Sequence, residues 1–195
     1  MRSAVLMAAL DELAAGGYGS FSCEAVAERA GVHKTTVYRR WGTRENLMLD
    51  ALLEAGNVSV PIPDTGSLLG DLAAYATAHA AVITAPAFEA TVRAVAATGD
   101  HDPALADASR RFWRTRGELA GEIVERAIAR GEVPPQSNPE IVIEALTAPM
   151  YFRLLMSGEP IDAEFVQAVA ELVAAGARAA PGSPSATTGS PSKPG

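Results

Sequence analysis

The sequence predicts an all-α protein. Nearly half of its 195 residues are hydrophobic, and many of these are alanine and leucine, which favour helices. Apolar residues recur every three or four positions along most of the chain, which is the period of an amphipathic helix. One stretch, residues 58–63, alternates weakly like a strand, but its two prolines argue against that interpretation. We therefore expect helices without a sheet.

The first sixty residues should form four helices, each bounded by a capping residue or by glycine. The glycines at 16–19 should end the first helix, and Gly31 and Gly42 should stop the second and third. Ser22 and Thr43 can accept hydrogen bonds from the first N–H groups of a helix, so they should begin the second and fourth helices. The expected spans are about 2–15, 23–29, 34–41 and 44–55.

A second group of helices should follow a turn with proline and glycine at 57–66. Pro86 marks the end of one helix, and Pro149 falls inside another, which it should kink. The last residues, 181–195, are mostly proline, glycine, serine and threonine, so we expect a disordered tail. The expected helices of this group span about 67–84, 88–98, 103–130, 139–157 and 162–179.

The charge of the chain is unevenly distributed. Its net charge is −7, which argues against nonspecific coating of nucleic acid. Residues 29–44 nevertheless hold five basic side chains and no acid. A short basic island on an acidic protein indicates a localised anionic partner.

Cysteine usage and hydropathy indicate a soluble, cytoplasmic protein without a membrane partner. Cys23 is the one cysteine, so no disulfide can form within the chain. No apolar run reaches the roughly 18 residues that a membrane span requires. The N-terminal segment is not interpreted as a signal peptide, because Asp11 and Glu12 interrupt its apolar stretch and make it amphipathic.

Residues 22–47 have the pattern of a helix-turn-helix. Two short helices are joined by a tight turn that contains Gly31, and a capped apolar helix follows them. In such a pair the second helix lies in the major groove of DNA, where its N-terminal residues contact base edges. Here that helix is 34–41, and Val37 and Trp41, four residues apart, would anchor it on the core.

The other side chains of this segment have the chemistry that DNA requires. Lys34 and Arg39 can reach guanine edges or phosphates, and threonine can bond a base or contact a thymine methyl group. The Tyr38 hydroxyl and the N–H groups that follow Thr43 are expected to donate to phosphates. The expected DNA-binding residues are Ser22, His33, Lys34, Thr35, Thr36, Tyr38, Arg39, Arg40, Thr43 and Arg44.

A simpler alternative is that these basic residues form an ordinary solvated face, as charge runs on surface helices commonly do. The order of the elements favours DNA binding instead. A cap, a short helix, a glycine turn and an aromatic-bearing helix are followed by a second glycine, a second cap and an apolar helix.

Three motifs in this region resemble the DNA-binding domain of the TetR family of bacterial regulators. They are A-E-R-A-G-V at 27–32, K-T-T-V-Y-R-R-W at 34–41 and T-R-E-N-L at 43–47. A looser resemblance, P-M-Y-F-R-L-L-M-S-G-E-P-I at 149–161, matches the penultimate helix and turn of one subgroup of the family. The resemblance implies about nine helices, a dimer built from the last two long helices, and a ligand pocket in the C-terminal body.

The resemblance also implies which residues contact DNA. In the family the third helix supplies base and phosphate contacts, and its positions here are Lys34, Thr35, Thr36, Tyr38 and Arg39. The caps of the second and fourth helices supply further phosphate contacts, here Ser22, Thr43 and Arg44.

Two features depart from the family pattern. His33 stands where a small hydroxyl residue often caps the recognition helix, so its role as a cap or as a DNA contact is open. Many relatives also have a basic arm before the first helix, whereas this sequence begins at that helix. Minor-groove contacts from such an arm are therefore not assumed.

These features divide the chain into a TetR-type helix-turn-helix domain at 1–48, a helical ligand-binding and dimerisation domain at 49–180, and the tail at 181–195. A homodimer is favoured because a helix-turn-helix monomer reads too few base pairs for useful specificity. Its expected interface is the helices at about 139–157 and 162–179. Their small residues allow close approach, and they are Ala145, Ala148, Ala168 and Gly176.

The expected effector is a small, mostly apolar molecule bound among aromatic residues of the body. No cofactor or metal is expected, since no histidine has a partner at metal-ligand spacing. Cys23 is interpreted as a small core residue, although a redox-sensing thiolate at a helix start is the alternative. The residues expected to line the effector pocket are Tyr75, Phe88 and Phe112.

The function predicted from these features is a ligand-responsive homodimeric repressor of a palindromic operator, not an enzyme. Three alternatives can be distinguished. A DNA-binding dimer without a ligand would have no cavity in its body. A helical enzyme would have a buried polar cluster with strongly shifted pKa values. A scaffold for an acidic protein would not prefer operator over random DNA.

Overall fold

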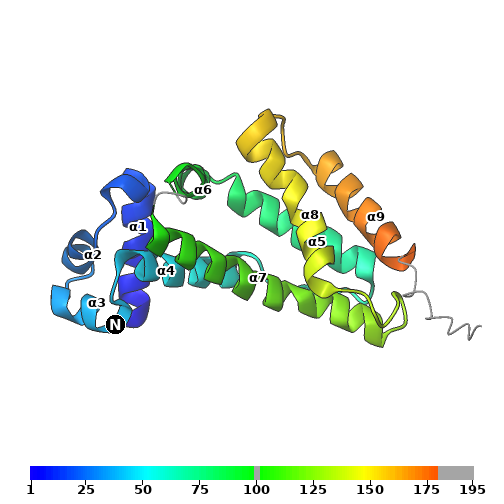
Figure 1. Cartoon of the computed structure of the whole chain (residues 1–195), viewed down its shortest axis with the longest axis horizontal. Coiled ribbons are helices and arrows are strands. Elements are labelled where there is room, and N and C mark those ends of the chain that lie inside the picture. Colours follow the sequence, from blue (N-terminus) through cyan, green and yellow to red (C-terminus); the bar gives the residue numbers. More distant parts are fainter. Residues whose placement is uncertain (99–101, 180–195) are drawn as a thin grey trace, which may run out of the picture.

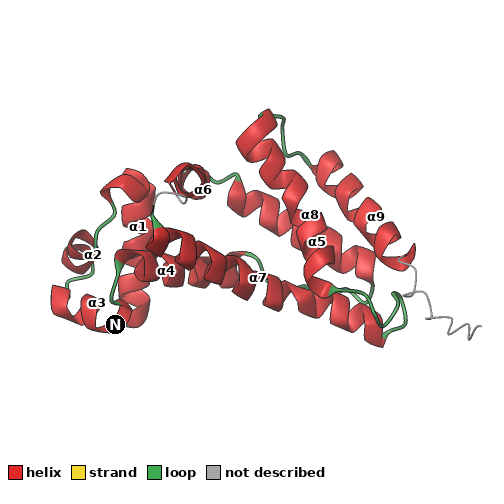
Figure 2. Ribbon diagram, in the orientation of Figure 1, coloured by secondary structure: helices red, strands yellow, loops and turns green. Residues whose placement is uncertain are grey.

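The computed structural model describes residues 1–98 and 102–179, which form nine α-helices and no strand (Figures 1 and 2). The all-α prediction is therefore confirmed, whereas the expected tail at 181–195 lies outside the described residues. No helix within them combines the length and hydrophobicity needed to cross a membrane. The elements are α1 (Arg2–Ser20), α2 (Cys23–Arg29), α3 (Lys34–Trp41), α4 (Arg44–Ser59), α5 (Leu68–Ile83), α6 (Pro86–Thr98), α7 (Pro103–Ala129), α8 (Pro139–Phe152), the π-helical turn η2 (Arg153–Ser157) and α9 (Ala163–Ala179).

Side-chain caps explain why most helix starts are predictable from the sequence. The Ser22 Oγ accepts a hydrogen bond from an N–H group in the first turn of α2, at 3.1 Å. Ser67 caps α5 in the same way, at 3.2 Å. Asp102 and Asn138 cap α7 and α8, and each is followed by proline, whose missing N–H costs nothing in the first turn.

Gly17 interrupts α1 with a φ of +64°, a conformation that favours glycine, so the regular helix stops within the run of glycines that was expected to end it, and a short further turn reaches Ser20. Two other helices are longer than the sequence pattern indicates. Helix α4 continues to Ser59, past its predicted end. Helix α6 begins at Pro86, which was expected only to end the preceding helix.

The helices pack around two hydrophobic cores. Helices α1 to α4 enclose the first, the N-terminal core, and α5, α7, α8 and α9 enclose the second, the body core. Leu105 of α7 belongs to the N-terminal core, so this long helix connects the two groups. The domain boundary expected at 48/49 falls inside α4 and remains a prediction.

The helix expected at 139–157 changes its form near its end. Pro149 removes one hydrogen-bond donor from α8, and the chain passes into the wider π turn η2 four residues later. The Arg153 guanidinium lies over the Phe165 ring of α9, 3.5 Å from its centroid, which holds η2 against α9. On the outer side Phe152 and Met156 are 60% and 76% exposed.

Replacing Leu72 with alanine should lower the free energy of unfolding by about 2–5 kcal/mol, because this side chain is fully buried and its loss leaves a cavity in the body core. Urea denaturation at a fixed protein concentration, followed by circular dichroism, measures the change. Met7→Ala is the control, since Met7 is 64% exposed on α1. Equal losses in the two variants would contradict the position of the body core.

Candidate nucleic-acid interface

Helices α2 and α3 form a helix-turn-helix at the end of the molecule away from α9 (Figure 1). Two backbone hydrogen bonds close the turn, from the Gly31 N–H to the Glu28 carbonyl at 3.1 Å and from the Val32 N–H to the Ala27 carbonyl at 3.0 Å. Gly31 has a φ of +65°, which a side chain at this position would disfavour. The turn thus sets the direction in which α3 leaves α2.

The inner face of α3 is fixed on the N-terminal core, as the spacing predicts. Val37 is fully buried and Trp41 is 8% exposed. The Trp41 indole Nε1 donates to an Asp50 carboxylate oxygen of α4 at 2.9 Å, and the other oxygen of Asp50 pairs with Arg2 of α1 at 2.9 Å. Helices α1, α3 and α4 are thereby joined through one carboxylate.

The outer face of α3 carries most of the predicted DNA contacts. Thr36 is half-buried, and the exposed residues are His33, Lys34, Thr35, Tyr38, Arg39 and Arg40. Because the inner face is anchored, these side chains are presented as one rigid, basic surface. That is what a recognition helix needs to enter the major groove.

His33 begins α3 without capping it. Its backbone is extended, but its side chain accepts no hydrogen bond from the helix; instead its Nδ1 lies 3.0 Å from the Thr35 hydroxyl oxygen. The imidazole is exposed at the N-terminal end of α3. This leaves His33 available for DNA, and that role remains a prediction.

The Tyr38 hydroxyl has a protein partner that the sequence did not indicate. It donates to a Glu24 carboxylate oxygen of α2 at 2.9 Å, and this hydrogen bond is the main cause that raises the Tyr38 pKa. Tyr38 was expected to donate to a phosphate. For that contact to form, the hydroxyl must leave Glu24, whose negative charge also lies beside the DNA-facing surface.

Arg44 is partly exposed, and several contacts within the protein hold its guanidinium in place. Its Nε donates to Glu45 at 2.8 Å, and its guanidinium lies 4.5 Å from the centroid of the Tyr18 ring. A further hydrogen bond joins it to the Tyr18 hydroxyl at 3.1 Å. These contacts stabilise the junction of α1 and α4, a structural role that the sequence analysis missed.

The same tyrosine connects the helix-turn-helix to α7. The Tyr18 hydroxyl lies 3.0 Å from Asp102, the cap of α7, and 3.2 Å from Glu45, and its single proton can serve one of them at a time. Burial, followed by the bond to Asp102, raises the pKa of Tyr18 to about 12. The hydroxyl therefore stays protonated and remains a donor at neutral pH.

The two caps predicted to bind phosphate both form. The Thr43 hydroxyl accepts from the Asn46 N–H at 3.2 Å, as the Ser22 hydroxyl does at the start of α2. A hydroxyl that accepts in this way still has its own proton to donate. Capping and a phosphate contact are therefore compatible, and the phosphate contacts remain predictions.

Comparison with known families assigns both halves of the chain. Residues 5–51 match the family described as bacterial regulatory proteins, tetR family. Residues 62–173 match the tetracyclin repressor-like C-terminal domain. The chain belongs to the TetR family. This confirms the resemblance that the motifs of α2, α3 and α4 indicate.

Individual relatives support the assignment to the TetR family. The chain is 32% identical to the HTH-type transcriptional regulator AqdR of Rhodococcus erythropolis, over 90% of this chain and 84% of that protein. It is 33% identical to the DNA-binding transcriptional repressor TetR of Mycobacteroides abscessus, over 85% and 87% of the two chains. The crystal structure of the TetR family transcription regulator SCO0332 matches with a TM-score of 0.80 and 31% identity, over 90% of this chain and 97% of that one. This TetR-family chain is thus a DNA-binding transcription regulator and not an enzyme.

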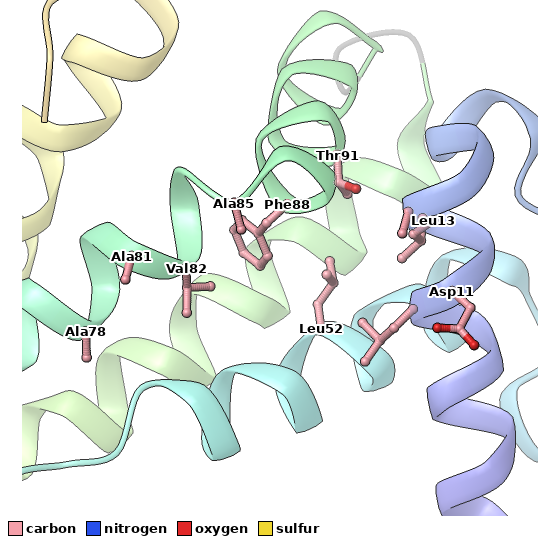
Figure 3. Close-up of a pocket in the computed structure, with 11 residues that line it drawn as sticks. Asp11, Leu13, Leu52, Ala78, Ala81, Val82, Ala85, Phe88 and Thr91 are labelled. Carbon is pink, nitrogen blue, oxygen red and sulfur yellow. The ribbon is translucent and has the colours of Figure 1, made fainter.

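A cavity of about 530 Å³ lies where α1 and α4 meet α5 and α6 (Figure 3). Of the three residues expected to line an effector pocket, Phe88 lines this cavity and Tyr75 and Phe112 do not, and the role of all three in effector binding remains a prediction. Tyr75 of α5 is buried, and its hydroxyl accepts a hydrogen bond from Arg116 of α7. The lining is almost wholly apolar, and it comes from Leu10, Asp11, Leu13, Ala14, Leu52, Ala78, Ala81, Val82, Ala85, Phe88 and Thr91.

Cys23 has the environment of a core residue. It is 2% exposed, and burial is the main cause that raises the pKa of its thiol to about 11. The thiol is therefore protonated at neutral pH, although it stands at a helix start. Within residues 1–98 and 102–179, no three His, Cys, Asp or Glu side chains gather closely enough to hold a metal ion.

Lys34→Ala should weaken binding to DNA and lower the slope of log affinity against log salt by about one unit, if Lys34 neutralises one phosphate. Electrophoretic mobility shifts over a salt series measure both quantities. Arg178→Ala is the control, because Arg178 is an exposed cation on α9, at the end of the molecule away from α3. An unchanged affinity and slope in Lys34→Ala would remove this residue from the interface.

Glu24→Gln should tighten DNA binding by roughly threefold, because it removes a negative charge beside the phosphates and weakens the bond that occupies Tyr38. The same mobility-shift assay tests this, with Glu125→Gln on the exposed side of α7 as the control. Weaker binding by Glu24→Gln would show instead that Glu24 orients Tyr38 for its DNA contact.

Proposed function

We propose that this TetR-family protein is a ligand-responsive homodimeric repressor that binds a palindromic operator in the cytoplasm. The observation that carries the proposal is the two-sided nature of α3. Val37 and Trp41 fix one side on the core, and Lys34, Thr35 and Arg39 are exposed on the other. A short helix held in this way can be inserted into the major groove without being reordered.

The predicted contacts separate into two kinds. Lys34, Thr35 and Thr36 stand at the N-terminal end of α3, where a recognition helix approaches base edges. Tyr38, Arg39 and Arg40 and the caps Ser22 and Thr43 are assigned to the flanking phosphates, which fix the register of the protein on the duplex. Arg44 contributes mainly by holding the start of α4.

A second copy of the chain is the proposed partner for the outer face of α8, η2 and α9. Four large apolar side chains are 60–76% exposed there, and exposed apolar side chains gathered on neighbouring elements favour association. The exposed small residues Ala145, Ala148, Ala168 and Gly176 permit close helix approach. The four large residues of this dimer face are Ile141, Phe152, Met156 and Leu172.

The DNA-facing surface of α3 and the dimer face assign different functions to the two parts of the chain. Residues 1–48 read DNA, and residues 49–180 dimerise and bind the effector. The relative from Mycobacteroides abscessus is described as a repressor, which supports repression here. The cavity of about 530 Å³ favours a ligand-responsive protein over a dimer without a ligand. An effector would change DNA affinity by the usual allosteric coupling of about 1–3 kcal/mol.

The test is binding of the purified protein to the DNA upstream of its own gene, compared with a scrambled duplex of equal length over a salt series. We expect selective binding of two chains per site. Leu172→Glu should dissociate the dimer and weaken operator binding, because it places a charge in the dimer face. Sedimentation velocity reports the oligomeric state, and Thr77→Glu on the exposed side of α5 is the control.

Equal and steeply salt-dependent binding to both duplexes would count against operator recognition at this site. A genome-wide selection of bound sequences would then separate a wrong operator from a basic surface with another partner. Operator binding by a stable monomer would contradict the dimer but leave the DNA-binding function in place.

A further inference from the structure

Five aromatic rings from α5, α7 and α8 contact one another in sequence within the C-terminal body. We call this group the aromatic cluster, and it consists of Tyr75, His79, Tyr151, Trp113 and Phe112. The ring of His79 stacks on Tyr75 at 5.9 Å and meets Tyr151 edge-on at 5.6 Å. Trp113 contacts Tyr151 and Phe112 edge-on, at 5.1 and 4.9 Å. Tyr75 and Phe112, both expected to line the effector pocket, belong to this cluster.

Two polar atoms of the aromatic cluster have no hydrogen-bond partner among the described residues. They are the His79 Nε2 and the Tyr151 hydroxyl oxygen, both buried. His79 as a whole is only 8% exposed. Buried polar groups are nearly always hydrogen-bonded to protein or to ordered water, so these two unpaired atoms on neighbouring rings mark a place where a ligand or a water with complementary polar atoms can bond.

The charges near the His79 Nε2 and the Tyr151 hydroxyl restrict the chemistry of a ligand that could bond them. Arg116 is 7% exposed and donates to the Tyr75 hydroxyl and the Val60 carbonyl, each at 3.3 Å. Burial, followed by the Arg116 charge, lowers the pKa of His79 to about 4, so the imidazole is neutral at pH 7. A buried guanidinium disfavours a cation and favours an oxygen that accepts hydrogen bonds.

Helix α5 joins the aromatic cluster to the cavity of Figure 3. Ala78 and Val82 form part of the cavity wall, and His79 lies between them in the sequence. At 100° per residue, His79 points about 100° away from Ala78 and about 60° away from Val82, so it lies beside this wall and does not line the cavity. A ligand whose apolar part occupies the cavity must therefore extend past Val82 to place a polar group at His79.

We propose that the effector is an amphiphile whose uncharged or anionic oxygen head bonds the His79 imidazole and the Tyr151 hydroxyl, while its apolar tail occupies the cavity beside Phe88. This inference rests on the ligand-responsive part of the proposed function. It assigns the head and the tail to different helices. The head joins α5 to α8, and the tail contacts α1 and α4 of the DNA-binding end.

The position of Tyr151 explains how binding of the ligand's head group would affect the proposed dimer face. Tyr151 lies between Pro149 and the π turn η2, where the helical ladder is already interrupted. Phe152, the next residue, is part of the proposed dimer face. A ligand bonded to Tyr151 acts on the segment that sets how the two copies meet.

Isothermal titration calorimetry of the full chain tests the proposal with three probes that share one tail: 4-pentylphenol, 4-pentylbenzoate and 4-pentylbenzylammonium. We expect the phenol and the benzoate to bind at least about tenfold more tightly than the ammonium compound. His79→Phe and Tyr151→Phe should each remove most of this preference. Glu125→Gln, on the exposed side of α7, is the control and should leave the preference unchanged.

The tail is tested with Ala78→Phe, which fills the cavity. It should weaken the pentyl compounds more than 4-methylphenol, which has no pentyl tail. Circular dichroism and operator binding without a probe verify that each variant folds.

Two results would overturn the proposal. The first is that His79→Phe and Tyr151→Phe bind the phenol and the benzoate as tightly as the unmutated protein does, or that the unmutated protein binds neither compound. The other is tighter binding of the ammonium compound that Asp11→Asn abolishes, since the head would then lie at the Asp11 rim of the cavity. Operator binding without a probe distinguishes this failure from failure of the DNA-binding function. Probe binding as expected without any loss of operator affinity would support the site and contradict ligand response.

Discussion

The burial of Val37 and Trp41 is the interaction on which the position of the recognition helix α3 depends. Helix α3 has eight residues, which is too short to be stable alone in water, so its order comes from this contact. The Trp41 indole, the Asp50 carboxylate and the Arg2 guanidinium then connect α3 to α4 and α1. The polar face of α3 is held in a fixed position because Val37 and Trp41 on the opposite face are packed in the N-terminal core.

The Tyr18 hydroxyl carries this rigidity into the body. It lies between Glu45 at the start of α4 and Asp102 at the start of α7, and the Arg44 guanidinium covers its ring. Helix α7 runs on through the body core to Ala129. Any displacement of α7 relative to α4 must therefore break these bonds or move the DNA-binding helices with it. This is a physical route by which an effector in the body can change operator affinity.

Local signals in the sequence predict most of the fold, whereas contacts between residues far apart in the sequence could not be predicted from it. Caps such as Ser22 and turns such as Gly31 act within a few residues, so the helix-turn-helix and its outward face follow from the pattern. The bond from Tyr38 to Glu24 depends on how α2 crosses α3. The residues predicted for the effector pocket show the same limit: Phe88 lines the cavity, whereas Tyr75 of α5 and Phe112 of α7 belong to the aromatic cluster.

Major-groove reading by two copies of α3 is the central claim, and methylation interference on the operator tests it most directly. Dimethyl sulfate methylates the N7 of guanine in the major groove and the N3 of adenine in the minor groove. We expect N7 methylation to block binding at two symmetric clusters of guanines whose centres lie about 10 base pairs, or a multiple of that, apart. Interference confined to adenine N3, or to one cluster without a symmetric mate, would contradict the claim.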